Sequence, residues 1–479
     1  EENVDDIMEG LKWLGLDWDS FARQRDRADD YTRTIQKLKD NGRLYPCYET
    51  EEELALKRKV QLSRGLPPVY DREALKLTPE QKAKFEAEGR KPHWRFKLNH
   101  EPIKWHDLVR GEVEFNGKDM SDPVLVREDG RPLYHICSVI DDIDFKITHI
   151  VRGEDHVTNT ATHVQMFEAL GAKPPQFAHV TLLGDMEGGK LSKRKGGFGI
   201  KSLREEVGIE PMALISLVAR IGTSDPIEPL FTMEQVIESF DFSKFSRNLP
   251  KFDEDELYRL NSKILHQTPF AAVKDRLAAL GLTEIDEHFW NAVRPNLEIL
   301  SDIREWWQVA KGPVQPVIKD AELAKLAAEL LPTDPWDNTT WQKWTDQIKL
   351  KTNRRGKELF MPLRCAITGQ EHGPELKELL PLIGRQRVLE RLKANPFTAG
   401  VPVHVVSGGD DSDRGKELGA VGFLRKPVDR EAVVQALERV GAGNAPRRRR
   451  LLLVDHDPAS RADIVALLSA ENASIVEAG

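Results

Sequence analysis

The sequence predicts a chain of several domains, with an α/β layer interrupted by an insertion, a long helical region and a second, smaller α/β module. Three observations support this prediction. Short strand-like runs alternate with helical patterns from about 123 to 199. Helical periodicity then dominates from about 202 to 393, and β-like runs return after about 394 in VPVHVVS and GFLRKPV. The 479 residues are enough for about three or four domains of ordinary size.

The first elements follow from spacing and turn residues. Apolar residues from Val4 to Leu14 share one helical face, and a second helix is predicted before the turns at Asn41-Gly42 and Pro46. Residues 50–92 form a charged helical stretch, and the period changes to two in HWRFKL and GEVEF, which indicates strands. The chain starts with Glu1 inside a helical pattern and stops just after a strand pattern. We therefore expect both ends to be cuts.

The next segment, from Pro123 to Glu154, is predicted to be rich in strands, including LYHICSVIDDID and KITHIVRG. A helix at about 158–170, a strand in FAHVTLLGD and a Gly- and Lys-rich loop follow. The helical region holds six of the ten tryptophans between 290 and 344. After the linker GAGNAPRRRR, the last residues predict strand, helix and strand.

Composition excludes several classes of protein. No apolar run approaches the roughly 18 residues of a membrane-spanning helix. Three cysteines far apart in sequence cannot make a disulfide framework, which indicates a reducing compartment. The net charge of −8 argues against a uniformly basic surface for nucleic acid. Any nucleic-acid site must therefore be a local basic face.

The strongest local signal is the loop GGKLSKRKGG at 188–197. Four basic residues among glycines and a serine offer free backbone N–H groups and ammonium groups to a polyphosphate. The loop is not a P-loop, because GxxxxGK[ST] is not present. A solvated basic loop with no ligand is the alternative interpretation.

KLSKR resembles the KMSKS loop of class I aminoacyl-tRNA synthetases. With LYHICSVIDDIDFKITHIVRGEDHVTNTATHVQMFEALG upstream and TGQEHGPELKELLPLIG downstream, residues 1 to about 393 resemble the bacterial glutamyl-tRNA synthetase family. The resemblance implies a Rossmann-type catalytic domain with an inserted acceptor-stem domain and a helical anticodon-binding domain. We expect a partial catalytic domain at 1–45, the insertion at 46–125, the second catalytic half at 126–200, a stem-contact region at 201–250 and the anticodon-binding domain at 251–393.

The resemblance also implies the reaction and its residues. Glutamate and ATP give glutamyl-adenylate and pyrophosphate, and the glutamyl group then passes to the 3′ end of tRNA(Glu). The implied catalytic residues are Lys190, Ser192 and Lys193. ATP binding is implied for Lys193 and for Asp155, with Glu154 as an alternative. Glutamate binding is implied for Tyr134, Ser138 and Arg152. Tyr134 could instead belong to the core, and Arg152 could pair with Asp141, Asp142 or Asp144.

We expect the reaction to need ATP and Mg²⁺. We expect the chain to bind no zinc and no membrane, to be a monomer and to be cytoplasmic. His149, His156 and His163 recur at a spacing of seven, but the first lies in a strand pattern and the third in a helix, so a shared metal is not predicted. The inserted domain has only Cys47, so a structural zinc is not predicted either. The HIGH motif of the family does not occur in this chain. We therefore expect impaired formation of the adenylate.

The six tryptophans between 290 and 344 could stack on anticodon bases, but most are expected in the core. Residues 397–441 resemble the second half of a response-regulator receiver domain, with Ser407 at the switch position and Lys426 before a proline. Residues 451–479, after a linker at 442–450, resemble a first half, with Asp455 and Asp457 as the acidic pair. Two alternatives stay open: a glutaminyl-tRNA synthetase, and a phosphorelay signalling protein with a synthetase-like scaffold.

Overall fold

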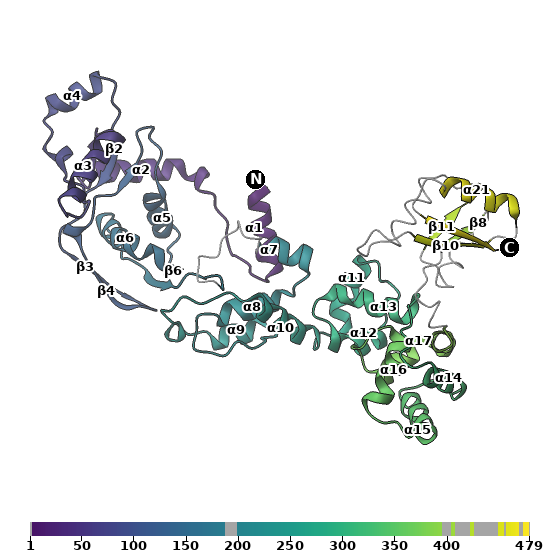
Figure 1. Ribbon diagram of the computed structural model, residues 1–479. Helices are drawn as coiled ribbons and strands as arrows, with labels where there is room; N and C mark the ends of the chain where they lie inside the picture. The colour runs from purple at the N-terminus through teal and green to yellow at the C-terminus, as the bar shows by residue number, and fades with distance from the viewer. Residues whose placement is uncertain are drawn as a thin grey trace. The chain divides into compact units, whose positions relative to one another are not determined.

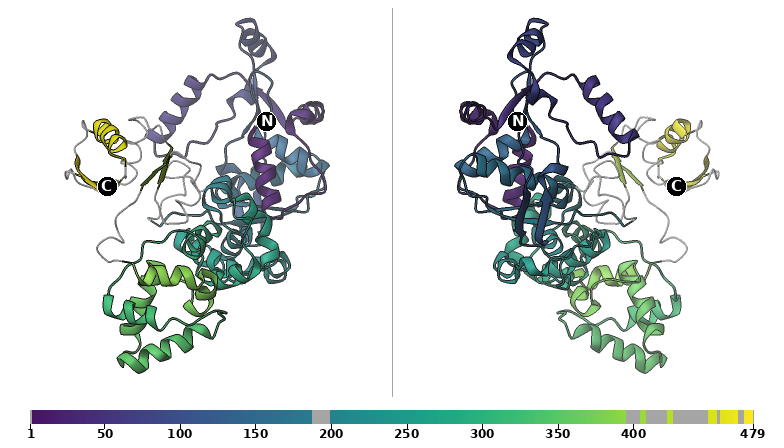
Figure 2. Two further views of the ribbon diagram at one scale, coloured as in Figure 1. Left: turned by 90° about the vertical axis from the view of Figure 1, so that its right-hand side faces the viewer. Right: turned by 90° about the vertical axis from the view of Figure 1, so that its left-hand side faces the viewer.

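The computed structural model describes residues 2–186, 199–394, 404–407, 422–425, 449–454, 457–468 and 473–478. The chain divides into two compact units, residues 1–264 and residues 265–479. The first is coloured purple to teal and the second green to yellow in Figures 1 and 2. Of the catalytic residues predicted from sequence, Lys190, Ser192 and Lys193 lie outside the described residues.

Unit 1 opens with the two helices that the sequence predicts, α1 (Glu2–Trp13) and α2 (Ala28–Asp40). Helix α2 buries Tyr31, Ile35 and Leu38, which recur at the spacing of one helical face. Its exposed face carries charges at both ends. The helix therefore packs through a single stripe.

A small antiparallel sheet in the order β1-β2-β5 follows, formed by β1 (Leu44–Cys47), β2 (His93–Phe96) and β5 (Val124–Val126). Between β1 and β2 the chain forms α3 (Glu51–Ser63) and α4 (Pro79–Ala87). Each helix starts with a capping box, in which a threonine and the residue three positions later satisfy each other's backbone N–H groups. These caps explain why a charged stretch with few buried residues forms two separate helices.

The second sheet has four strands in the order β4-β3-β7-β6. Its strands β3 and β4 pair antiparallel, whereas β3 with β7 and β7 with β6 pair parallel. Helices α5 and α6 each contribute four buried residues to one apolar core, which also includes residues of this sheet and of α2. The elements are β3 (Pro102–Asp107), β4 (Gly111–Asn116), α5 (Tyr134–Asp144), β6 (His149–Gly153), α6 (Val157–Ala169) and β7 (Gln176–Val180).

The prediction of a strand for LYHICSVIDDID is wrong, because the segment forms α5. Its β-branched residues favour a strand locally, but Ile136, Cys137, Val139 and Ile140 are all buried. Residues at positions i, i+1, i+3 and i+4 share a helical stripe, whereas in a strand they would fall on both faces. Packing against α2 and α6 therefore overrides the local propensity.

From residue 199 onward, the regular elements of unit 1 are helices, as predicted. Helix α8 begins with Pro211 in its first turn and buries five consecutive residues from Ala213 to Leu217. A five-residue π-helical turn follows the short α7. The helices are α7 (Ile200–Ser202), α8 (Pro211–Arg220), α9 (Met233–Ser239) and α10 (Glu254–Leu265).

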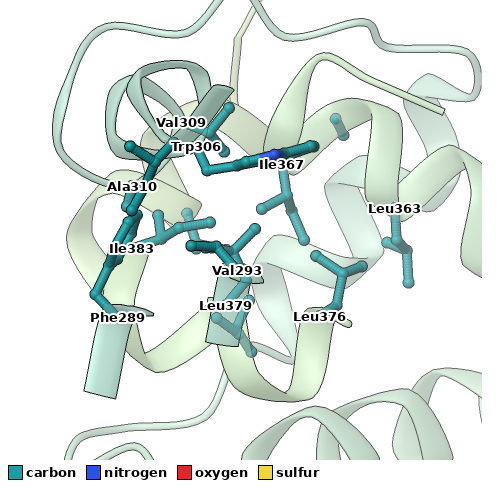
Figure 3. Close-up of a cluster of buried hydrophobic side chains, with 14 of the residues drawn as sticks. Phe289, Val293, Trp306, Val309, Ala310, Leu363, Ile367, Leu376, Leu379 and Ile383 are labelled. Atoms are coloured by element: carbon teal, nitrogen blue, oxygen red, sulfur yellow. The ribbon is translucent and has the colours of Figure 1, made fainter. Parts of the chain in front are cut away.

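Residues 265–394 of unit 2 form a helical bundle with a large apolar core, part of which is drawn in Figure 3. Of its six tryptophans, Trp290, Trp306 and Trp344 are buried, and the other three are partly buried against the same core. The expectation that most of them are core residues is confirmed. The helices are α11 (Phe270–Ala279), α12 (Glu287–Val293), α13 (Ile303–Lys311), α14 (Ala321–Glu329), α15 (Thr340–Thr352), α16 (Lys357–Thr368), α17 (Leu376–Ile383) and α18 (Arg385–Leu392).

Beyond residue 394, the described residues form two pairs of parallel strands. Strand β8 (His404–Ser407) pairs with β9 (Gly422–Arg425). Strand β10 (Arg449–Val454) pairs with β11 (Ala473–Ala478), and α21 (Pro458–Leu468) connects them. This order of strand, helix and strand matches the prediction for 451–479. In the described part of the chain, no helix is long and apolar enough to cross a membrane.

Candidate active site

Three polar residues meet where the parallel strands of the larger sheet end. Asp107 is the last residue of β3, and Arg152 and His179 lie opposite each other near the ends of β6 and β7. In open α/β sheets, ligands bind beyond the carboxyl ends of the parallel strands. The strand order therefore places these side chains at the expected position for a binding site.

Arg152 is held by side chains from three elements. Its Nη1 donates to the Tyr134 hydroxyl at 3.2 Å, its Nη2 to Thr160 Oγ1 at 2.5 Å, and its Nε to His179 Nε2 at 3.4 Å. A guanidinium has five N–H groups, so these three bonds leave two N–H groups for a ligand. The three partners are neutral acceptors. The positive charge of Arg152 is therefore not neutralised within this set.

A buried aspartate–histidine pair, Asp107 and His179, contacts Arg152 through the histidine ring. The side chains of Asp107 and His179 are both fully buried, with 2.5 Å between Oδ2 and Nδ1, and Oδ1 accepts from the His179 backbone at 3.1 Å. Burial by itself raises the pKa of Asp107, but these hydrogen bonds and two more from the Val109 and Arg110 backbone outweigh it, so the pKa lies well below its usual range. The Asp107 carboxylate therefore accepts a hydrogen bond from the Nδ1–H group of His179, and Nε2 of His179 accepts from Arg152 and Thr160.

Tyr134 stands at the first turn of α5 with 48% of its surface exposed, so the alternative that it is a core residue does not hold. Its ring lies beside three imidazoles, with centroid distances of 5.5 Å to His135, 5.7 Å to His156 and 5.9 Å to His163. His163 is fully buried and shares a hydrogen bond of 2.9 Å with His135. Burial, the charge of Arg152 and the neighbouring imidazoles lower the pKa of His163 to about 2. His163 is therefore neutral at physiological pH.

The acidic residues near Arg152 are engaged elsewhere. Asp141 accepts hydrogen bonds from Arg27 at 2.7 Å and from the Tyr31 hydroxyl at 3.0 Å, and Arg27 also pairs with Asp144. Among the described residues, no carboxylate lies within ion-pair distance of Arg152. The alternative that Arg152 pairs with the acidic end of α5 is therefore not supported.

Asp142 differs from its neighbours. Burial raises its pKa to about 6, although the charge of Arg152 opposes this shift. Ser138 lies on α5 four residues after Tyr134 and is half-buried, which places it one turn along the same side of the helix. The sequence-predicted residues Tyr134, Ser138 and Arg152 therefore lie along one region of unit 1.

The two candidate acidic residues after β6 have different surroundings. Glu154 forms an ion pair of 2.9 Å with Arg110. The Asp155 side chain is half exposed and 4.0 Å from His156 Nε2. A Cβ atom on Gly153 would come within 2.5 Å of Asp155 Oδ1, so the Asp155 carboxylate lies close to the backbone at Gly153. Of the two, Asp155 is the more available to a ligand.

Sequence reasoning missed three residues of this network, Asp107, Thr160 and His179. A histidine in the apolar run FAHVTLL was the available signal, since a buried imidazole needs a partner. The metal interpretation of the histidines has no support. The described residues hold no group of three or more His, Cys, Asp or Glu that could bind a metal ion.

Of the four residues predicted to be receiver-like, Ser407 and Asp457 lie in the described part of the chain. Ser407 ends β8, and Asp457 directly precedes α21. Lys426 and Asp455 lie outside the described residues. The strands near Ser407 and Asp457 have the predicted order, and their receiver-like roles stay predictions.

Comparisons with known proteins match both units. The family described as tRNA synthetases class I (E and Q), catalytic domain, matches residues 1–259, and the anticodon binding domain family matches residues 290–395. A glutamate–tRNA ligase of Azospirillum brasilense is 54% identical over 391 residues, which are 82% of this chain and 87% of the relative. Glutamate–tRNA ligase 1 of Maricaulis maris is 52% identical over 388 residues, covering 81% of this chain and 87% of that protein.

A solved structure gives the same result. The crystal structure of a glutamate tRNA ligase from Elizabethkingia meningosepticum in complex with its amino acid is similar with a TM-score of 0.70 and 26% identity. The similarity covers 81% of this chain and 87% of that chain.

Proposed function

The chain belongs to the class I family of glutamyl- and glutaminyl-tRNA synthetases and is a glutamate–tRNA ligase, and we propose that Arg152 and Tyr134 hold its substrate glutamate. The observation that supports this proposal is the set of neutral partners around Arg152. Its two remaining N–H groups can grip a carboxylate with parallel hydrogen bonds. The exposed Tyr134 hydroxyl stands beside them, and Ser138 one turn further along α5 offers a third polar contact.

As a class I synthetase the chain uses ATP. In the proposed first step, a carboxylate oxygen of glutamate attacks the α-phosphorus, and the bond from that phosphorus to pyrophosphate breaks. Lys193 would stabilise the charge that grows on the phosphates, with Lys190 and Ser192 supporting the loop. Asp155 would approach the nucleotide, which agrees with its exposure and with the ion pair that engages Glu154.

In the second step a hydroxyl of the terminal adenosine of tRNA(Glu) attacks the acyl carbon, loses its proton, and AMP leaves. The anticodon-binding family match at 290–395 supports tRNA(Glu) as the partner of unit 2. We assign contact with the acceptor stem to the inserted domain at 46–125, on the family resemblance alone.

Further proposals concern the metal ion, the location of the protein and the last part of the chain. Mg²⁺ would arrive with ATP, since the described residues hold no group of three or more His, Cys, Asp or Glu that could bind a metal ion. We predict that the chain binds no zinc, that it is a monomer and that it forms the adenylate poorly. Three buried free cysteines are consistent with a cytoplasmic location. The strand–helix–strand unit β10-α21-β11 supports a receiver-like origin for the last residues.

The test is charging of tRNA with radiolabelled amino acid by the purified chain. We expect glutamate, and not glutamine, to become attached to tRNA(Glu), at the low rate that the predicted impairment of adenylate formation implies, with release of one AMP and one pyrophosphate per product. Attachment of glutamine to tRNA(Gln) would instead support the glutaminyl alternative. Absence of any charging would refute the proposed function of this chain.

A further inference from the structure

The β3–β4 turn, residues 108–110, is fixed by the same carboxylate that supports the candidate glutamate site. Asp107 Oδ1 accepts hydrogen bonds from two backbone N–H groups of the turn, one of them that of Arg110 at 3.0 Å. The other oxygen, Oδ2, binds His179, whose ring contacts Arg152. A shift of the turn would therefore move the carboxylate on which the orientation of Arg152 depends.

The side chain of Arg110 extends from this turn to the chain that follows β6. Its Nη1 donates to Glu154 Oε2 at 2.9 Å, and the two side chains are 30% and 33% exposed. Glu154 follows Arg152 by two positions and directly precedes Asp155. Without Arg110, the charge of the Glu154 carboxylate would oppose the approach of glutamate and ATP, which are both anions.

A third contact reaches Arg110 from the helical part of unit 1. Arg247 Nη2 donates to the Arg110 carbonyl at 2.5 Å, across 137 positions of sequence. Arg247 lies between α9 and α10, in the segment 245–252, and the backbone of this segment is bound to the loop after α8. There the Ser246 N–H donates to the Gly222 carbonyl at 2.7 Å. The donor that reaches Arg110 therefore comes from a part of the chain that is itself held in place.

The segment 245–252 is also bound to the residues that precede the loop GGKLSKRKGG at 188–197. Gly184 exchanges two backbone hydrogen bonds of 2.9 Å with this segment. The Lys251 ammonium group donates to the Met186 carbonyl at 3.2 Å. Within unit 1, one short segment thus connects the β3–β4 turn with the residues before the loop that the sequence assigns to the phosphates.

Small contacts of this kind affect position more than stability. A hydrogen bond from an exposed arginine to a carbonyl group contributes little to the free energy of unfolding. A displacement of about 1 Å at a reacting group can nevertheless lower a rate about 100-fold. The N–H group, the side chain and the carbonyl group of Arg110 each bind a different segment of unit 1. Loss of one bond at Arg110 would therefore be felt at the other two.

We propose that Arg247 and Arg110 are positioning residues of the ligase. Arg247, through the Arg110 carbonyl, holds the β3–β4 turn and thereby the network that orients Arg152. The Arg110 side chain pairs with Glu154 and leaves Asp155 to approach the nucleotide. The proposal rests on the proposed function, which assigns glutamate to Arg152 and ATP to Asp155.

The first experiment measures hydrogen exchange of backbone amides in the full chain by mass spectrometry. Arg247→Ala removes the bond to Arg110 and keeps the backbone anchors of its own segment. We expect exchange in peptides from the β3–β4 turn to become roughly three- to tenfold faster, because local opening depends on the bonds that close a segment. Arg247→Lys retains a cationic donor and should restore most of the protection.

The second experiment measures equilibrium binding of radiolabelled glutamate to the same proteins. Arg247→Ala should weaken binding roughly three- to tenfold, because a displaced Arg152 holds the carboxylate less well. A merely structural contact would lower the melting temperature without changing this affinity. The matched control is Arg131→Ala, which removes an exposed arginine paired with Asp129 two positions away. It should alter neither exchange in the β3–β4 turn nor glutamate binding, and circular dichroism melting checks that each variant is folded.

Arg110→Ala separates the two roles of this residue, because it removes the side chain and keeps the backbone N–H and carbonyl groups. Exchange in the β3–β4 turn should stay as in the unaltered chain. Binding of ATP should weaken roughly three- to tenfold, because the freed Glu154 carboxylate repels the phosphates. Adding Glu154→Gln to Arg110→Ala removes that charge and should restore the affinity for ATP.

Three results would overturn the inference. If Arg247→Ala changes exchange only in its own segment, the turn does not depend on Arg247. If the turn exchanges faster but glutamate binds as it does to Arg131→Ala, the turn does not position Arg152. If Glu154→Gln fails to restore ATP binding to Arg110→Ala, the pairing of Glu154 is not the task of Arg110. An unaltered chain that binds no glutamate would instead contradict the proposed function, and the exchange measurement would still decide whether Arg247 holds the turn.

Discussion

Replacing Asp107 by asparagine should destabilise unit 1 and misplace Arg152 at the same time. The amide has nearly the shape of the carboxylate, so its oxygen can still accept from the backbone groups that Asp107 binds. Its NH₂ group, however, would face the Nδ1–H of His179, which is a donor in the native pair. To avoid two opposed donors, the imidazole must move its proton to Nε2. That atom then can no longer accept from Arg152 or Thr160.

The magnitude follows from the bonds that change. A hydrogen bond to a charged group contributes about 1.5–3 kcal/mol, and both partners here are fully buried. With the weakened contact to Arg152, we expect Asp107→Asn to lower the free energy of unfolding by about 2–4 kcal/mol, measured by urea denaturation at pH 7. The KM for glutamate should rise about tenfold, with a smaller change in kcat, because a binding group is displaced. A purely structural role would lower stability without that selective rise in KM.

The effect on stability should depend on pH in a defined direction. The pKa of Asp107 is depressed in the folded chain, so its contribution is present above the unfolded pKa, about 3.9, and is lost as pH falls toward the folded pKa. The difference between the unaltered chain and Asp107→Asn should therefore be constant from pH 5 to 8 and narrow below pH 4. Asp129→Asn, which alters an exposed carboxylate paired with Arg131, is the control. Equal stability and equal KM for Asp107→Asn and the unaltered chain would refute the reasoning.

Three further predictions concern the same site. Arg152→Lys keeps the charge but loses the two-pronged grip, so the KM for glutamate in tRNA-dependent ATP–pyrophosphate exchange should rise on the order of 100-fold; an unchanged KM would exclude Arg152 as the carboxylate ligand. Asp142→Asn removes a carboxyl group whose pKa is raised to about 6, so it should raise the melting temperature at pH 8 and have little effect at pH 4; the opposite pH dependence would contradict the burial argument. Lys193→Ala should lower the rate of activation about a hundredfold, or about 3 kcal/mol, with a much smaller change in the KM for ATP; equal losses in both would contradict a role in the transition state.

The local sequence pattern was sufficient to predict most helices and strands. It failed where packing against distant parts of the chain determines the conformation. The helical stripe of α2 and the capped starts of α3 and α4 follow from spacing and from short-range hydrogen bonds. Helix α5 was mistaken for a strand because its β-branched residues have high strand propensity, whereas burial against α2 and α6 determines its conformation. A resemblance of motifs located Tyr134 and Arg152, and the structure shows the contacts between them.

The network beneath Arg152 could not be found in the same way. Asp107 and His179 are separated by 72 positions in sequence, and they meet only because β3 and β7 are neighbours in the sheet. No periodicity carries information about such a pair. A histidine inside an apolar strand is the single local sign, and it does not identify its partner. Strand order, which is a property of the whole unit, supplies that partner.

The positive charge of Arg152 is available to a substrate because a different arginine, Arg27, pairs with the carboxylates at the end of α5. Asp141 and Asp144 project from the end of α5, the same helix that carries Tyr134, and Arg27 of the segment before α2 pairs with both. Without Arg27, Asp141 and Asp144 would lose their arginine partner, and their negative charge on the helix that carries Tyr134 would oppose the approach of the glutamate carboxylate. Asp107 does not contact Arg152 directly. It binds the His179 ring, and His179 Nε2 accepts a hydrogen bond from Arg152 Nε, which orients the guanidinium without an ion pair. Replacement of Arg27 should therefore weaken glutamate binding indirectly, although Arg27 touches none of the residues that hold Arg152 in place.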